Sequence, residues 1–102
     1  METQIKNWIL AAISDDYEEF SMIVDEVTKW ASELSLSVTP QEIARELESW
    51  IASGFAQAFL LSNTQPYATT VNFSFEDIGK LWFYVTPAGK KLVEENDRQY
   101  NS

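Results

Sequence analysis

The stretch that most constrains the fold is VTPQEIARELESWIASGFAQAFLL, residues 38–61. Thr39 is a favourable N-cap, Pro40 suits the first position of a helix, and Glu42 can complete a capping box with Thr39. Gly54 can adopt the left-handed conformation at which helices commonly end. The stretch therefore predicts a helix over residues 40–53, followed at once by a short apolar strand over residues 55–61.

This helix has one apolar face, formed by residues that recur at helical spacing: Ile43, Leu47, Trp50 and Ile51. Val38, before the cap, is placed to form a hydrophobic staple with Ile43. We expect Trp50 to be buried in the core, because a face of this kind packs against the rest of the domain. We expect Gly54 to have a positive φ, because the chain must turn sharply from helix to strand.

Two further helices are predicted before this stretch. The first is short and amphipathic, with apolar positions Ile5, Trp8, Ile9, Ala12 and Ile13. Asp16 and Glu19 have the spacing of a capping box and predict the start of a longer second helix. Its apolar positions are Phe20, Ile23, Val24, Val27, Ala31 and Leu34.

The second half of the chain predicts a hairpin and a last helix. Residues 62–70 have the composition of a loop, and Val71, Phe73 and Phe75 alternate with polar residues as in a half-exposed strand. Residues 81–85 predict a returning strand. Thr86 and Pro87 repeat the cap-and-proline start and predict a final helix, which we expect to fray from about residue 95.

Composition limits the classes of function. The 102 residues suffice for one domain with a single core, residues 1–102. The chain has no cysteine and no histidine, which excludes thiolate chemistry and removes the commonest general base and metal ligand. The serines and threonines therefore have no histidine to activate them, and there is no phosphate-binding loop of the Walker type. We expect no enzyme activity, no cofactor and no metal.

The location of the protein is also predicted from composition. No apolar run approaches the ~20 residues of a membrane span, and the first residues do not resemble a signal peptide. We therefore expect a soluble, cytoplasmic protein that does not bind membranes.

The net charge of −9 is concentrated in one part of the chain. Residues 14–48 contain ten acidic residues against Lys29 and Arg45, a balance of −8, whereas residues 1–13 balance at zero and residues 49–102 at −1. Such a field disfavours nucleic acid and favours either simple solubility or a basic partner protein. Asp15, Asp16, Glu18 and Glu19 belong to this acidic part, and we interpret them as helix-capping residues rather than as ligands of a hard metal ion.

The predicted order of elements resembles that of a winged helix-turn-helix domain. TPQEIARELESWIASGF is similar to the recognition-helix segment of winged-helix regulators, and LWFYVTPAGKKLVEE is similar to the returning strand and following helix of MarR-like and PadR-like transcriptional regulators. The second motif places Val85, Thr86 and Gly89 at the last three positions of an aromatic–Leu–Thr–x–x–Gly pattern. The resemblance implies an α+β fold, mainly α, with a small antiparallel sheet.

The resemblance also implies a DNA-binding face, at the outward residues Gln41, Ala44, Arg45 and Glu48 near the start of the third helix. Gln41 and Arg45 could read adenine and guanine. The same helix carries three glutamates, and the wing expected over residues 62–79 has no lysine or arginine to neutralise phosphates. Later basic residues offer an alternative DNA surface: Lys80, Lys90, Lys91 and Arg98.

Aromatic residues suggest a different use of the fold. Trp82 and Tyr84 alternate with Leu81, Phe83 and Val85, so the two sets must face opposite sides of a strand. With Phe73 and Phe75, they predict either a protein interface or a face that the first or last helix covers. We expect an interaction module, self-associating as a homodimer or binding a protein partner. The alternatives are a small DNA-binding regulator and an acidic surface that occupies a basic partner.

Overall fold

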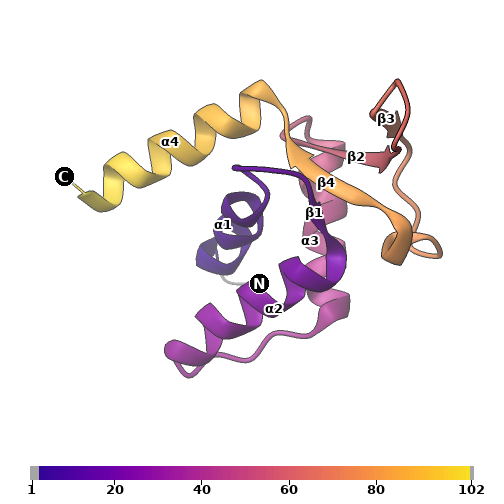
Figure 1. Ribbon diagram of the computed structural model, residues 1–102. Helices are drawn as coiled ribbons and strands as arrows, with labels where there is room; N and C mark the ends of the chain where they lie inside the picture. The colour runs from indigo at the N-terminus through magenta and orange to yellow at the C-terminus, as the bar shows by residue number, and fades with distance from the viewer. Residues whose placement is uncertain (1–2, 102) are drawn as a thin grey trace.

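The computed structural model describes the backbone of residues 3–101 and the side chains of residues 4–96. Four helices and a four-stranded antiparallel sheet make up an α+β fold, as predicted (Figure 1). In chain order the elements are α1 (Thr3–Ala12), β1 (Glu18–Glu19), α2 (Phe20–Glu33), α3 (Pro40–Ala52), β2 (Ala56–Leu61), β3 (Ala68–Val71), the short 3₁₀-helix η1 (Ile78–Lys80), β4 (Trp82–Val85) and α4 (Pro87–Asn101).

The α3–β2 segment has the predicted local structure. The Thr39 hydroxyl accepts a hydrogen bond from the Glu42 N–H at 3.1 Å, and the Glu42 carboxylate accepts one from the Thr39 N–H at 3.3 Å, which completes the capping box. Gly54 has a φ of +83°, which confirms the left-handed end of the helix. Trp50 is buried, with 7% of its surface exposed.

The sheet has the strand order β1-β4-β2-β3. β2 and β4 are antiparallel neighbours with Ala58 opposite Phe83, so the predicted pairing of the strand after α3 with the strand before α4 is confirmed. β1 was not predicted. It consists of only Glu18 and Glu19, and it forms because these residues pair with Phe83 and Trp82 of β4, a tertiary contact that no local pattern indicates.

The predicted start of the second helix is wrong. The Asp16 carboxylate accepts a hydrogen bond from the N–H of Tyr17 at 2.7 Å and does not cap the helix. The helix begins at Phe20 after Glu19, whose side chain makes no capping bond, because β1 takes up the residues between. Ile23, Val27 and Ala31 of α2 are buried as predicted. Leu34 is exposed, because α2 ends at Glu33.

The predicted strand through Phe73 and Phe75 is only partly correct. β3 runs from Ala68 to Val71, so it starts inside the predicted loop and ends before both phenylalanines. Four residues pair with β2, from Ala68 opposite Leu61 to Val71 opposite Ala58. The partner strand therefore sets the limits of β3, rather than its own alternating pattern.

The core lies between the helices and one face of the sheet. Its large, fully buried side chains include Ile9 of α1, Ile23 of α2, Leu47 of α3 and Phe83 of β4. The strand β4 is alternately buried and half-buried, which confirms that Leu81, Phe83 and Val85 face opposite to Trp82 and Tyr84.

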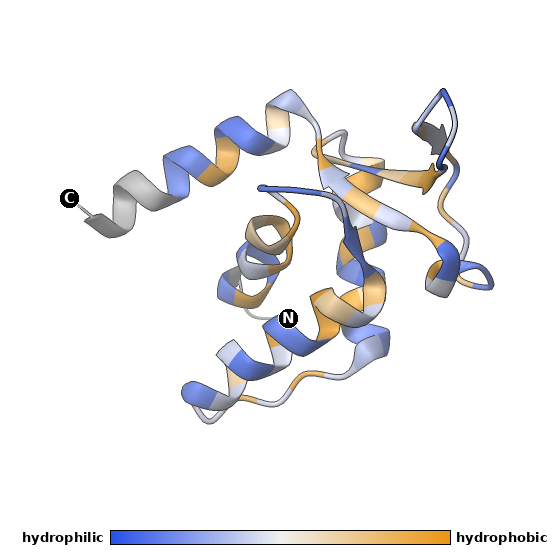
Figure 2. Cartoon of the chain, viewed as in Figure 1, coloured by the Kyte–Doolittle hydropathy of each residue, from blue (hydrophilic) through white to orange (hydrophobic). Residues whose placement is uncertain are grey.

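The helix α4 begins beside the end of α3 and contacts α1. The Thr86 hydroxyl donates to the carbonyl of Gly54 at 2.7 Å and accepts from the Gly89 N–H at 3.2 Å, as expected of an N-cap. A side chain at Gly89 would overlap the carbonyl oxygen of Phe55, so this position requires glycine. α4 then runs away from the sheet and is mostly hydrophilic (Figures 1 and 2). Its backbone is helical to Asn101, while Ser102 lies outside the described residues, so fraying of the tail stays a prediction.

Candidate functional site

The outer face of the sheet, opposite the core, gathers four aromatic side chains: Tyr17, Phe59, Trp82 and Tyr84. The strand register places Phe59 beside Trp82, and Tyr17 lies just before β1, next to Tyr84. The ring centroids of Tyr17 and Phe59 are 5.0 Å apart, and those of Tyr17 and Tyr84 are 5.2 Å apart. All four side chains are half-buried. We call this surface the outer aromatic face.

A cleft of about 670 Å³ adjoins the outer aromatic face at the β2–β3 turn. Its lining contains no charged residue and consists of Tyr17, Leu61, Ser62, Asn63, Tyr67, Ala68 and Trp82. Aromatic rings with a few hydroxyl and amide groups suit an uncharged partner, because rings supply apolar contact area and the polar groups fix orientation.

The four side chains predicted as one interface belong to two separate surfaces. Trp82 and Tyr84 belong to the outer aromatic face, whereas Phe73 packs toward the core, with its ring centroid 6.2 Å from that of Phe83. Phe75 packs on Phe73 at 4.8 Å and is 50% exposed. Phe73 and Phe75 therefore lie apart from Trp82 and Tyr84, because β3 ends at Val71 before reaching them. That any of the four side chains forms an interface stays a prediction.

The second surface is a cleft of about 380 Å³ beside the start of α3. It is lined by Phe20, Pro40, Gln41, Ala44, Arg45, Phe75 and Ile78. Three of the four residues predicted for a DNA-binding face are exposed: Gln41, Arg45 and Glu48. The expectation that Ala44 points outward is wrong, since Ala44 is buried with 7% of its surface exposed.

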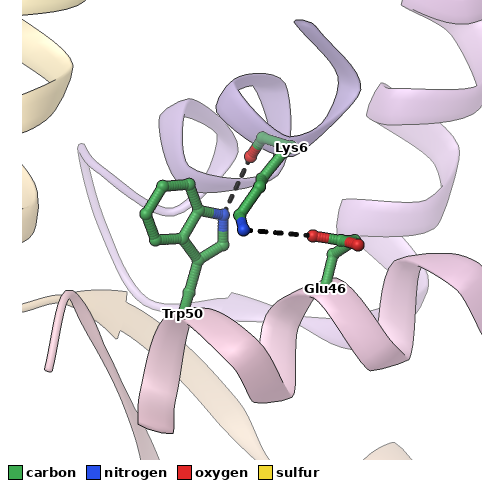
Figure 3. A network of polar contacts seen from close by, with 3 residues as sticks. All are labelled: Lys6, Glu46 and Trp50. Atoms are coloured by element: carbon green, nitrogen blue, oxygen red, sulfur yellow. Dashed lines mark hydrogen bonds and ion pairs between the residues drawn. The ribbon is translucent and has the colours of Figure 1, made fainter. Parts of the chain in front are cut away.

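The Trp50 and Glu46 side chains of α3 contact Lys6 of α1 and so join the two helices. The Trp50 indole N–H donates to the Lys6 carbonyl oxygen at 2.9 Å, and the Lys6 ammonium lies 3.8 Å from a Glu46 carboxylate oxygen and 5.2 Å from the centre of the Trp50 ring (Figure 3). The Glu46 oxygen nearest Lys6 is buried and accepts no hydrogen bond within the described residues, so Lys6 stabilises it only as an ion pair.

The acidic residues around β1 repel one another. Burial raises the pKa of the Glu18 carboxyl, and the negative charges of Glu26, Asp16, Asp15 and Glu19 raise this pKa further. Within the described residues, no three acidic side chains are grouped closely enough to hold a metal ion. The acidic side chains around β1 thus form a region of concentrated negative charge.

The later basic residues are exposed where the structure describes their side chains. Lys80 lies at the end of η1, and Lys90 and Lys91 lie in the first turns of α4. The Arg98 side chain lies outside the described residues. The alternative DNA surface thus stays a prediction.

Tyr17 and Phe59 were missing from the predicted site. For Phe59 a signal exists, since Gln57, Phe59 and Leu61 alternate with the buried Ala56 and Ala58 along β2. For Tyr17 there is no local signal, because only the pairing of β1 with β4 brings it to this face.

In the part of the chain that is described, no helix is long and apolar enough to cross a membrane. No protein-family model matches the sequence, and no curated protein matches it.

Proposed function

We propose that this protein is a non-catalytic interaction module of winged-helix architecture that self-associates and does not use α3 to bind DNA. The order of elements supports the architecture: three helices, a strand after the third, a returning strand and a terminal helix. The observation that carries the functional proposal is the outer aromatic face, where four rings remain partly exposed on a folded sheet beside the exposed Leu61 and Tyr67. Partly exposed aromatic clusters mark protein interaction sites.

The charge distribution supports an interface on the β2–β3 side of the outer aromatic face, because Glu19 lies opposite Trp82 on the β1 side. Residues 49–75 contain no aspartate, glutamate, lysine or arginine, although 23% of the chain is charged. This segment includes β2 and β3 and borders the outer aromatic face. Two copies with a net charge of −9 repel each other, so contact is least costly where neither copy carries charge.

The same distribution argues against ordinary DNA binding. Arg45 is the only basic residue on α3, which also carries Glu42, Glu46 and Glu48. The β2–β3 hairpin has no basic residue. Affinity for duplex DNA comes from several lysine or arginine contacts to phosphates, and one arginine does not supply it.

The test compares substitutions at two neighbouring leucines. Leu61 is 38% exposed and its side chain lies on the outer aromatic face, whereas Leu60 is 46% exposed and lies on the opposite face of β2. By sedimentation equilibrium from micromolar to millimolar concentration, we expect Leu61→Glu to weaken self-association by at least about tenfold, or about 1.4 kcal/mol. We expect Leu60→Glu to have a much smaller effect. A wild-type protein that remains monomeric throughout would refute the proposal.

The alternative function is a small DNA-binding transcriptional regulator, favoured by the exposure of Gln41 and Arg45 at the start of α3. Fluorescence anisotropy with a labelled random duplex distinguishes the two. We expect no binding at physiological salt. Micromolar binding that Arg45→Ala abolishes would favour the regulator.

A further inference from the structure

The sheet has two open edges, and they differ in length and charge. One edge is β1, which has only two residues, both glutamates. The other is β3, with four residues and no charge. Natural proteins commonly protect edge strands with charged residues, proline or very short length, because an open edge pairs readily with another strand. β1 has two of these protections, whereas the segment Ala68–Val71 has none.

The hydrogen bonds of the hairpin identify which backbone groups of β3 are free. The Tyr67 carbonyl accepts a hydrogen bond from the Ser62 N–H at 2.9 Å, so Tyr67 directs its backbone groups at β2. Backbone direction alternates along an antiparallel strand, so Thr69 and Val71 also face β2. The N–H and C=O groups of Ala68 and Thr70 therefore point away from the sheet.

We propose that a second copy of this chain pairs with β3 in an antiparallel register centred on Thr69. Ala68 of one copy lies opposite Thr70 of the other, and the two Thr69 residues lie opposite each other across the two-fold axis. This register satisfies both free residues of each copy with four hydrogen bonds. This β3–β3 pairing rests on the self-association proposed above and specifies which strand forms the contact between the two copies.

Charge favours a second copy as the occupant of this edge. The strand order places β3 at the far side of the sheet from β1, where the acidic residues gather. Pairing at β3 therefore keeps the two acidic regions apart, and pairing at β1 would bring four glutamates together.

The pairing also joins the outer aromatic faces of the two copies. Ala68 lies opposite Leu61 and Thr70 opposite Phe59, so the side chains of Ala68 and Thr70 lie on the outer face. The uncharged cleft, which Ala68 and Tyr67 line, then borders the junction. Because four-residue edges bury little surface, the dimer is of the weak, concentration-dependent class.

A cysteine cross-link tests the register. The chain has no cysteine, so Thr69→Cys introduces a single thiol. The paired Thr69 residues are a non-hydrogen-bonded pair with Cα atoms about 4.5 Å apart, within the range that a disulfide spans. We expect a disulfide-linked dimer under mild oxidation in non-reducing electrophoresis. Ser37→Cys, on an exposed loop before α3, is the control and should cross-link far less.

A proline substitution tests the backbone contacts. Thr70→Pro removes an N–H that points outward, so it should weaken self-association by at least about tenfold. Thr70→Val keeps the N–H and should associate as the wild type does. The Thr69→Cys cross-link decides the register even if Thr70→Pro does not fold.

The outcomes separate this inference from the proposed function. A wild-type dimer that survives Thr70→Pro, with no Thr69→Cys cross-link above the Ser37→Cys level, overturns the β3 pairing and leaves self-association intact. A wild-type protein that is monomeric at millimolar concentration overturns both.

Discussion

The two ends of the sheet contrast in a way that bears on function. At the β1 end, Glu18 and Glu19 lie beside Asp15 and Asp16, and burial together with like charges raises the pKa of Glu18. At the β3 end, residues 49–75 have no charged side chain, and the aromatic rings lie between the two ends, from Tyr17 beside β1 to Phe59 on β2. Under the proposed self-association, the charged β1 end would repel a second copy, and contact would form at the uncharged β3 end.

The first prediction tests whether the two ends form one cooperative unit. Trp50 joins α1 through its bond to the Lys6 carbonyl and contacts Phe55, just before β2, with ring centroids 5.5 Å apart. We expect Trp50→Ala to cost about 3–5 kcal/mol of unfolding free energy, because it leaves a large cavity. Urea unfolding followed by circular dichroism measures this loss.

A milder substitution serves as the control. Trp50→Phe keeps a ring and loses the N–H, so it should cost about 1–2 kcal/mol. If the unfolding curve of Trp50→Ala shows two separate transitions, only one end of the sheet has been destabilised. The two ends would then unfold independently.

The second prediction concerns the turn into the uncharged end. Gly54 has a φ of +83°, and a Cβ there would meet no atom within 4 Å. Gly54→Val should therefore cost more than about 1 kcal/mol through backbone strain alone. Gly79→Ala is the control, because that position is equally open and lacks a positive φ. Equal melting temperatures of the two variants would show that the left-handed conformation at Gly54 does not contribute to stability.

The third prediction uses salt to sharpen the contrast. If contact occurs at the uncharged end, salt screens the repulsion between two acidic copies, and raising the ionic strength should strengthen self-association by about threefold. Sedimentation equilibrium at low and high sodium chloride measures this change. If salt weakens self-association, the contact contains ion pairs. The acidic residues around β1 and the lysines of α4 would then be the contacting groups.

The fourth prediction is the smallest and concerns pH. The folded state raises the pKa of Glu18 above its ordinary value of 4.5, so it favours the protonated form. The protonated carboxyl contributes stability below pH 4.5, and this contribution is lost as the pH rises through the folded-state pKa. We expect Glu18→Gln to raise the melting temperature slightly at pH 7 and to lose this advantage in acid.

The control for this effect is Glu33→Gln, at the exposed end of α2. It lies away from β1, so the same change of charge should give a smaller gain at pH 7. Equal gains in both variants would mean that net charge, rather than the crowding around β1, sets the effect.

Local sequence patterns were sufficient where a few neighbouring residues determine the conformation. The Thr39–Glu42 capping box, the Gly54 turn and the cap at Thr86 are each complete within a few residues, so they could be predicted. The burial of Trp50 and the alternation along β4 follow from helical and strand periodicity in the same way.

The tertiary structure decided the features that depend on partner strands. β1 exists because Glu18 and Glu19 pair with β4, β3 ends where its pairing with β2 ends, and Phe73 turns toward the core beyond that point. The aromatic face therefore contains Tyr17 and Phe59 in place of Phe73 and Phe75. The sequence determined the helical segments, the strands β2 and β4 and the charged surface, because those patterns are local. Only tertiary pairing decided which side chains share a face, because register depends on residues far apart in the chain.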